Sequence, residues 1–477
     1  MAPKSDSIEP APASFDLLIR NGTVATAGDT VRCDIGIRGG RIVALGEQLG
    51  RAENVIDATG RLVTPGGIDS HCHMDQQPWE GQQTVDDFRS GTLSAACGGT
   101  TTVIPFAMPL RGQSLRAVVD DYHRRANGKA VVDYAFHLVV SDPTAQVLGQ
   151  DLPALIRDGC TSFKVYLTYE GLALADEEVL NVLDLARREG AMVMVHAEND
   201  AVVRWLTDRL LATGHTQIKH HLAAHPSIGD REATHRAISF SELLDVPILI
   251  THVSHRDGAE QIRWAQTRGL KIYGETCPQY LFLSSDDIDM HGMEGAKCVC
   301  TPPPRDKSNQ EHIWRGLQNG TFQVFSSDHS PYRYVDKIKG GPDTPFTKVP
   351  NGVPGIELRM PLLLSEGVNK GRITLNQFVA LTATNAARIY GLYPRKGTIA
   401  VGSDADIAIW DTEREWTVTH GLLHDNCDYS PYEGMKLRGW PVMTLSRGET
   451  VWSDGKPHGA PGRGQFLRCD LPEAPRP

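Results

Sequence analysis

The feature that most constrains this chain is an alternation of short apolar strands with amphipathic helical stretches between about residues 64 and 390. Two such helical stretches are residues 176–190, DEEVLNVLDLARREG, and residues 258–269, GAEQIRWAQTRG. Eight successive strand–helix units predict the α/β class and a (β/α)8, TIM-like barrel. The eight expected strands are residues 61–71, 99–107, 131–140, 160–168, 191–198, 246–254, 270–278 and 321–329.

Both ends of the chain show a different, hairpin-rich pattern. Residues 15–63 form short alternating runs separated by Asn-Gly, Gly-Gly and Thr-Gly turns, and residues 397–411 and 441–455 resemble them. We therefore expect a small β-sandwich domain built from both chain ends. The expected divisions are a disordered tail at 1–13, sandwich strands at 14–63, the barrel at 64–392, further sandwich strands at 393–460 and a C-terminal tail at 461–477.

The composition is that of a globular protein and excludes several other classes. The net charge is −10, and an acidic chain is poorly suited to hold phosphate backbones, so we expect no nucleic-acid partner. The sequence has no apolar run long enough to span a membrane. The nine cysteines form no CxxC pair and the N-terminus lacks an apolar signal core. These features predict reduced thiols and a cytoplasmic protein.

Ionisable residues end six of the eight expected strands, although strands buried on both faces are normally apolar. In barrels of this kind the carboxyl ends of the strands carry the active site. Each such residue alone has an ordinary explanation, such as a satisfied histidine or an N-cap aspartate. Together they would point into one mouth, which predicts a metal site. The six candidates are His71, His73, Lys164, His196, His252 and Asp328.

The residue types suit a pair of divalent cations. His71 and His73 share one face of a strand because they are two positions apart. Lys164 is costly inside an apolar strand unless it is neutral, paired or able to reach the rim. A neutral lysine can add CO2 and become an anionic carbamate that bridges two cations. The carbamate, Asp328 and one hydroxide then nearly balance the two cations, for which zinc is expected, with manganese or cobalt as alternatives.

The motifs of the chain resemble those of the dihydropyrimidinase/hydantoinase family of cyclic amidohydrolases over nearly the whole length. They include GGIDSHCH, SFKVYLTY, HAEN, THVS, TPPPR, SSDHSP and KGTIAVGSDADIAIWD. The segments at 275–281, ETCPQYL, and 351–357, NGVPGIE, favour hydantoinase over dihydroorotase or urease. The resemblance implies a binuclear metal site in a barrel that carries an appended β-sandwich.

The resemblance also implies a role for each of the six candidates. His71, His73 and Asp328 would hold one metal, and His196 and His252 would hold the other. Lys164, modified to N6-carboxylysine, would bridge them.

Three further residues match positions that contact substrate in that family. Tyr169 matches the tyrosine that donates to the oxyanion, and Thr301 and Asn351 match main-chain contacts to the ring amide. A metal-bridging hydroxide would attack the ring carbonyl, with Asp328 as general base and then general acid. The expected product of a 5-substituted hydantoin or a 5,6-dihydropyrimidine is an N-carbamoyl amino acid.

The chain departs from the family pattern at residues 74–87, where Trp79 and Glu80 could alter the pocket mouth, and at Thr301, where the family usually has serine. An allantoinase or a cyclic-imide hydrolase therefore stays open as an alternative. More remote alternatives are a mononuclear barrel deaminase and a non-catalytic scaffold relative. The resemblance further implies a homotetramer or dimer, in which residues 420–477 could reach a neighbouring subunit.

Overall fold

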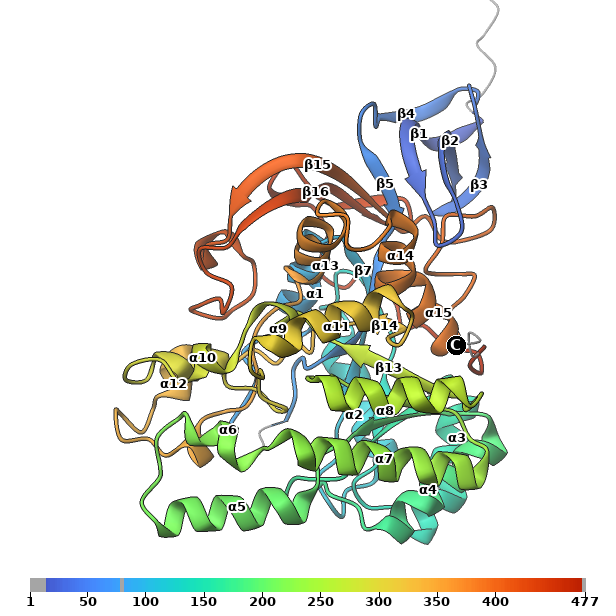
Figure 1. The fold of residues 1–477 in the computed structure, drawn as a ribbon. Coiled ribbons are helices and arrows are strands. Elements are labelled where there is room, and N and C mark those ends of the chain that lie inside the picture. Colours follow the sequence, from blue (N-terminus) through green and yellow to red (C-terminus); the bar gives the residue numbers. More distant parts are fainter. Residues whose placement is uncertain (1–13, 78–80, 474–477) are drawn as a thin grey trace, which may run out of the picture.

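The structure is a computed structural model that describes residues 14–77 and 81–473. The predictions for Trp79 and Glu80 lie outside the described residues. Figure 1 shows a barrel surrounded by helices, with a second, strand-rich region above it that joins blue N-terminal strands to orange and red C-terminal strands. Within the described part of the chain, every helix falls short of the length and apolar character needed to cross a membrane.

The barrel sheet contains eight parallel strands in sequence order, with one further short strand, β8, paired beside β7. Its ends meet where the main-chain N–H of His73 donates to the carbonyl of His329 at 2.7 Å. The predicted TIM-like barrel is confirmed. Its strands are β6 (Gly67–Cys72), β7 (Thr100–Ala107), β8 (Asp133–Tyr134), β9 (His137–Val139), β10 (Ser162–Tyr166), β11 (Met192–His196), β12 (Ile248–Ile250), β13 (Ile272–Thr276) and β14 (Val324–Phe325).

The alternation of side chains along β11 determines which residues point into the barrel. Val193 and Val195 pack in the core between strands and helices, whereas Met192 and Met194 pack in the core inside the barrel. Since successive side chains point to opposite faces, His196 continues the inward series. The parity of the strand therefore places an imidazole at the inner carboxyl end.

Residues at the two ends of each helix help to determine where the helices around the barrel begin and end, as α4 shows. Three acidic residues occupy its first turn and two arginines its last, which complements the helix dipole. Gly190 ends the helix at φ 75°, a conformation that glycine adopts without strain.

The α-helices have the following bounds, with short π-helical continuations after α13 and α14. They are α1 (Phe88–Cys97), α2 (Leu115–Ala126), α3 (Leu152–Arg157), α4 (Asp176–Glu189), α5 (Asp200–Ala212), α6 (His220–Ala224), α7 (Ser227–Leu244), α8 (Arg256–Thr267), α9 (Gln279–Phe282), α10 (Ser285–Ile288), α11 (Ser308–Gln318), α12 (Tyr334–Lys337), α13 (Arg359–Leu363), α14 (Leu375–Val379) and α15 (Asn385–Ile389).

The second sheet joins the two ends of the chain, as the β-sandwich prediction required. Its central strand β5 pairs in parallel with β1 and antiparallel with β15, and only Gly66 separates β5 from the first barrel strand. The domain boundaries themselves stay predictions. In spatial order the strands are β18 (Lys456–Pro457), β17 (Glu449–Ser453), β16 (Lys436–Ser446), β15 (Ile407–Thr417), β5 (Leu62–Pro65), β1 (Phe15–Ala25), β2 (Thr30–Arg38) and β3 (Arg41–Gly46), with β4 (Ala52–Asp57) paired to β1.

Candidate metal centre and pocket

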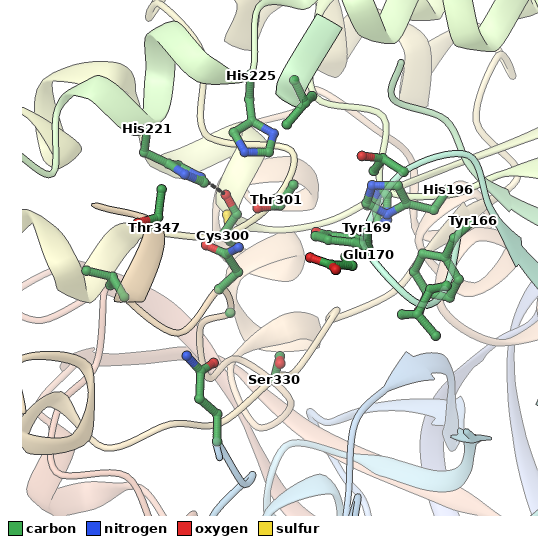
Figure 2. Close-up of a pocket in the computed structure, with 18 of the residues that line it drawn as sticks. Tyr166, Tyr169, Glu170, His196, His221, His225, Cys300, Thr301, Ser330 and Thr347 are labelled. Atoms are coloured by element: carbon green, nitrogen blue, oxygen red, sulfur yellow. Dashed lines mark hydrogen bonds between the residues drawn. The ribbon is translucent and has the colours of Figure 1, made fainter. Parts of the chain in front are cut away.

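A cavity of about 310 Å³ opens at the carboxyl end of the barrel strands. Figure 2 shows His196, Tyr166 and Tyr169 on one side of it, and His221, Cys300 and Thr347 on the other. Its wall includes most of the residues predicted from the sequence. Those lining it are His73, Lys164, Tyr169, His196, His252, Thr301, Asp328 and Asn351. His71 lies fully buried behind this wall, against Lys164.

Three residues of this wall have a positive φ although none is glycine. The values are 81° for Tyr169, 37° for His252 and 49° for Asp328. L-residues seldom adopt this region, and strain of this kind persists where the surrounding structure over-determines the backbone. All three follow the ends of strands, so the turns aim their side chains at the cavity.

Lys164, His71 and Asp328 form the centre of the cluster. The Nζ of Lys164 lies 2.8 Å from Nε2 of His71, which lies 3.2 Å from Oδ1 of Asp328. Nε2 of His73 lies 3.5 Å from the same carboxylate oxygen. Residues from the first, fourth and eighth predicted strands therefore meet at one point.

Burial controls the electrostatics of Lys164. Its side chain is 1% exposed, and Nζ lies over the rings of Phe106 and Tyr166 at 4.3 and 4.9 Å from their centroids. Desolvation lowers the pKa of Lys164 to about 8, although the negative charge of Asp328 partly opposes this shift. The amine therefore loses its proton far more easily than a solvated lysine does.

Asp328 keeps its negative charge despite burial. Desolvation raises its pKa, but the neighbouring His71 and His73 outweigh that effect and hold the pKa below its ordinary value. Gln279 adds a hydrogen bond from Nε2 to Oδ2 of Asp328 at 3.2 Å. The carboxylate is thus available as a ligand or a base at neutral pH.

Glu275, at the end of β13, orients ligands from two other strands. Its Oε1 accepts the main-chain N–H of His252 at 3.1 Å and lies 2.6 Å from Nδ1 of His71. Burial raises the pKa of Glu275 to about 8, against the opposing charge of Lys164. The contact holds the ring of His71 so that its Nε2 faces Lys164 at the centre of the cluster.

Glu198 has the same relation to His196. Its Oε2 lies 2.7 Å from Nε2 of His196, and its Oε1 lies 2.8 Å from Nδ1 of His225. Burial raises the pKa of Glu198, but His225 and the hydrogen bond from His196 outweigh it and hold the pKa below its ordinary value. The anionic carboxylate therefore fixes a tautomer of His196 whose lone pair is on Nδ1.

The three predicted substrate contacts lie around the same cavity. Tyr169 and Thr301 are neighbours in Figure 2, on loops that follow β10 and precede α11. Burial, reinforced by Glu198, raises the pKa of Tyr169 well above its ordinary value, so its hydroxyl stays protonated. Oγ1 of Thr301 and Oδ1 of Asn351 are buried and have no hydrogen-bond partner among the described residues.

The donor set fits divalent cations. Ligand atoms of His71, His73 and Asp328 lie within 4.8 Å of one another. The ring centroids of His196 and His252 lie 4.5 Å apart, and Nδ1 of His252 is buried without a hydrogen-bond partner in the described part of the chain. Imidazole and carboxylate ligands of this kind suit zinc and similar ions.

Comparison with known proteins agrees with this geometry. Residues 62–451 match the Amidohydrolase family. The chain is 43% identical to the D-hydantoinase of Rhizobium radiobacter, covering 95% of this chain and 99% of the relative. It is 45% identical to the D-hydantoinase of Geobacillus stearothermophilus, covering 94% and 96%. The chain belongs to the hydantoinase family.

A solved structure of the same family has nearly the same fold. The dihydropyrimidinase of Brevibacillus agri NCHU1002 superposes with a TM-score of 0.94 at 43% identity, covering 96% of this chain and 99% of that one. The resemblance expected from the sequence motifs is therefore confirmed. The individual roles of the site residues in this hydantoinase-family chain remain proposals, which the geometry above supports.

The structure also brings into the site residues that sequence reasoning did not single out. They are Glu198, His221, His225, Glu275 and Gln279. A signal was present for Glu275, because a carboxylate near the end of an apolar strand is unusual. His221 and His225 lie on and just after a short helix between distant strands, where no strand pattern connects them with the site.

Proposed function

We propose that this protein hydrolyses a ring C–N bond of a cyclic diamide, such as a 5-substituted hydantoin or a 5,6-dihydropyrimidine, and releases an N-carbamoyl amino acid. The observation that carries this proposal is the convergence of four histidines, a buried lysine of low pKa and an anionic aspartate in one pocket of a hydantoinase-family barrel. The remote alternatives, a mononuclear deaminase and a scaffold without catalysis, lack an explanation for Lys164.

The proposed cofactors are two divalent cations, zinc first, with manganese or cobalt as alternatives. One would be held by His71, His73 and Asp328 and the other by His196 and His252. When bound, the cations supply Lewis acidity, which makes a water molecule nucleophilic near neutral pH and draws electrons from the ring carbonyl.

Lys164 contributes an anion between the two sites. Its neutral Nζ attacks the carbon of CO2, forming an N–C bond and losing one proton, which leaves a carbamate with two oxygens. The low pKa of the buried amine supplies the neutral form that this addition requires. Between two divalent cations the negative charge of the carbamate would be paired, whereas an ammonium there would be repelled.

Asp328 moves the proton in the proposed hydrolysis. Asp328 is an anion beside His71 and His73. It accepts a proton from water while the water oxygen bonds to the ring carbonyl carbon. It then delivers that proton to the ring nitrogen as the C–N bond breaks. The phenol of Tyr169 stays protonated and donates to the carbonyl oxygen as negative charge develops there.

Main-chain groups at Thr301 and Asn351 are proposed to hold the ring amide. Both residues line the cavity beside Tyr169, and Gly352 next to Asn351 has φ 148° and no room for a side chain against Ser330. A backbone approach of this kind suits a small planar ring, which presents an alternating series of N–H and C=O groups.

A substrate panel tests the proposal. We expect ring opening of hydantoin and dihydrouracil, followed by loss of ultraviolet absorbance, at rates well above those for allantoin and succinimide. Preferential turnover of succinimide would instead identify a cyclic-imide hydrolase, and preferential turnover of allantoin an allantoinase. Failure on all four rings in the presence of zinc, manganese or cobalt would reject the proposed reaction.

The cytoplasmic location and the assembly into a homotetramer or dimer stay predictions. Light scattering of the purified protein tests the assembly, because a mass equal to the single chain of 52.2 kDa would contradict it.

A further inference from the structure

Gln76, three residues after the proposed ligand His73, has no part in the proposed reaction but contacts that ligand. It lies in the segment where the chain departs from the family pattern. Its side chain is 7% exposed and lines the cavity, and its Nε2 lies 2.8 Å from Nδ1 of His73. The contact joins a neutral amide directly to a residue of the proposed metal site.

The two ring nitrogens of His73 face different groups. Nε2 lies 3.5 Å from Oδ1 of Asp328, at the centre of the cluster, whereas Nδ1 faces Gln76. A cation held jointly with Asp328 would therefore take the lone pair of Nε2. Coordination there leaves the proton of the neutral ring on Nδ1, which then needs an acceptor.

The amide of Gln76 can act as donor or as acceptor at this place. Its nitrogen, which faces Nδ1 of His73, donates, whereas its oxygen accepts. Half a turn about the last side-chain bond exchanges the two atoms without moving the rest of the residue. The nitrogen suits the tautomer whose proton is on Nε2, and the oxygen suits the tautomer that binds a cation there.

Two other proposed ligands have a carboxyl group in the corresponding place. Oε1 of Glu275 lies 2.6 Å from Nδ1 of His71, and Oε2 of Glu198 lies 2.7 Å from Nε2 of His196. Polar partners of this kind orient the imidazoles that bind metals in proteins. At the third histidine the place is taken by an amide, which orients the ring without adding charge to the cluster.

The main chain around Gln76 is held by contacts of its own. The N–H of Gln76 donates to Oγ1 of Thr84 at 3.3 Å, and the N–H of Asp75 donates to the carbonyl of Asp86 at 2.8 Å. Nζ of Lys129 lies 3.2 Å from Oδ2 of Asp75. The amide therefore reaches the imidazole from a fixed position, and little entropy is lost when the hydrogen bond forms.

We propose that Gln76 is a positioning residue, which holds His73 in the orientation and tautomer that bind a cation through Nε2. This inference rests on the proposed function, because it concerns the metal site of His71, His73 and Asp328. Gln76 acts through His73, and the proposed reaction gives it no contact with the reacting atoms.

Stepwise removal of zinc from the loaded enzyme with a competing chelator tests the inference. Gln76→Met keeps the length of the side chain and removes its hydrogen bond. One of the two ions should then be released at a chelator concentration at least about tenfold lower than in the wild type. The other ion, held by His196 and His252, should be released as in the wild type. Unchanged retention of both ions, or equal weakening of both, would overturn the inference.

Two further variants separate the hydrogen bond from other effects of the substitution. Gln76→Glu keeps an oxygen acceptor, so it should retain both ions to within about threefold of the wild type or more tightly. It decides the question alone if Gln76→Met does not fold, since loss of an ion from it would refute the role. Gln77→Met is the matched control, because Nε2 of Gln77 donates to the carbonyl of Met108 at 2.7 Å instead of contacting a proposed ligand. Its zinc release should equal that of the wild type, and a loss like that of Gln76→Met would also refute the role.

The two proposals fail in different ways. If the wild type holds zinc and hydrolyses hydantoin but Gln76→Met releases zinc as the wild type does, the inference falls while the proposed function stands. If zinc retention is unchanged and only KM rises, Gln76 contacts the substrate, and its positioning role is likewise refuted. If the wild type retains no divalent cation and opens none of the rings, the proposed function falls, and the inference with it.

Discussion

Two lysines of this protein are equally buried and have opposite surroundings. Lys164, in the barrel mouth, and Lys396, where the barrel meets the second sheet, are each 1% exposed. Nζ of Lys396 lies 2.7 Å from Asp133, 2.7 Å from Asp406 and 3.1 Å from Asp404. Among the described residues no carboxylate oxygen lies within 4.0 Å of Nζ of Lys164, whose nearest polar neighbour is His71.

The difference shows in the two pKa values. Desolvation lowers the pKa of both lysines, but for Lys396 the surrounding aspartates outweigh it and raise the pKa above its ordinary value. For Lys164 desolvation prevails and the pKa falls to about 8. Lys396, with its set of carboxylates, holds structure together, whereas Lys164, which lines the cavity without such partners, is prepared for chemistry on its neutral amine.

The largest expected effect is that of Lys164→Ala on metal content and activity. The purified wild-type protein should contain about two divalent ions per chain, and the variant should lose both metal and at least about a thousandfold in kcat/KM. The reason is that the bridging anion disappears with the amine. Metal analysis and hydantoin hydrolysis provide the measurements, and ¹³C-bicarbonate should give a carbamate signal in the wild type alone.

Lys337 provides the matched control for that experiment. It is also buried, with a pKa lowered to about 8, but its Nζ donates to the carbonyls of Ala296 and Val299 at 2.9 and 3.0 Å. Lys337→Met should leave metal content unchanged. An active, metal-replete Lys164→Ala protein would refute the bridging role.

The second effect is the loss of stability when Lys396 is removed. Lys396→Met leaves the buried Asp406 without a cation and takes one of two cations from Asp133, so the free energy of unfolding should fall by about 3–5 kcal/mol. Denaturant unfolding monitored by circular dichroism measures it. The folded fraction should still bind metal. A drop below about 1 kcal/mol would show that the aspartates find other partners, among which Arg447 already contacts Asp133.

The sequence predicted the barrel, the joined sheet and the position of the site because the relevant signals are local. Lys164 and His196 were predicted from their places in and at the end of expected apolar strands, where barrel enzymes carry their chemistry. The sequence could not distinguish Lys164 from Lys396 by pairing, since Asp133 is 263 positions from Lys396 and only the fold brings them together. His221 and His225 escaped notice for the same reason, because their partners Cys300 and Glu198 are distant in sequence.

The third effect is a difference in how the two lysines respond to pH. For Lys164 the folded pKa of about 8 lies below the ordinary 10.5, so the unfolded chain binds more protons between those values and the stability of the metal-free protein rises with pH. Lys164→Met should therefore be more stable than metal-free wild type near pH 7, and the gain should shrink toward pH 10.

Lys396 provides the reference for that titration. Its folded pKa is raised, so its contribution is fully present below the ordinary 10.5 and is lost only as pH rises through the folded value. The cost of Lys396→Met should accordingly stay constant from about pH 7 to pH 10. Unfolding curves at several pH values measure both differences, and a constant gain for Lys164→Met would contradict the lowered pKa of its amine.

The smallest expected effect tests whether burial, and not the ion pair itself, determines how much a lysine contributes to the free energy of unfolding. Nζ of Lys271 lies 3.2 Å from Asp245, nearly the distance of Lys396 from Asp404, but the two side chains are 51% and 75% exposed. Water solvates both charges when the pair breaks, so Lys271→Ala should change the free energy of unfolding by about 0–1 kcal/mol. A loss as large as that of Lys396→Met would mean that the contact is decisive, and the contrast between Lys164 and Lys396 would then have to be explained by partner number alone.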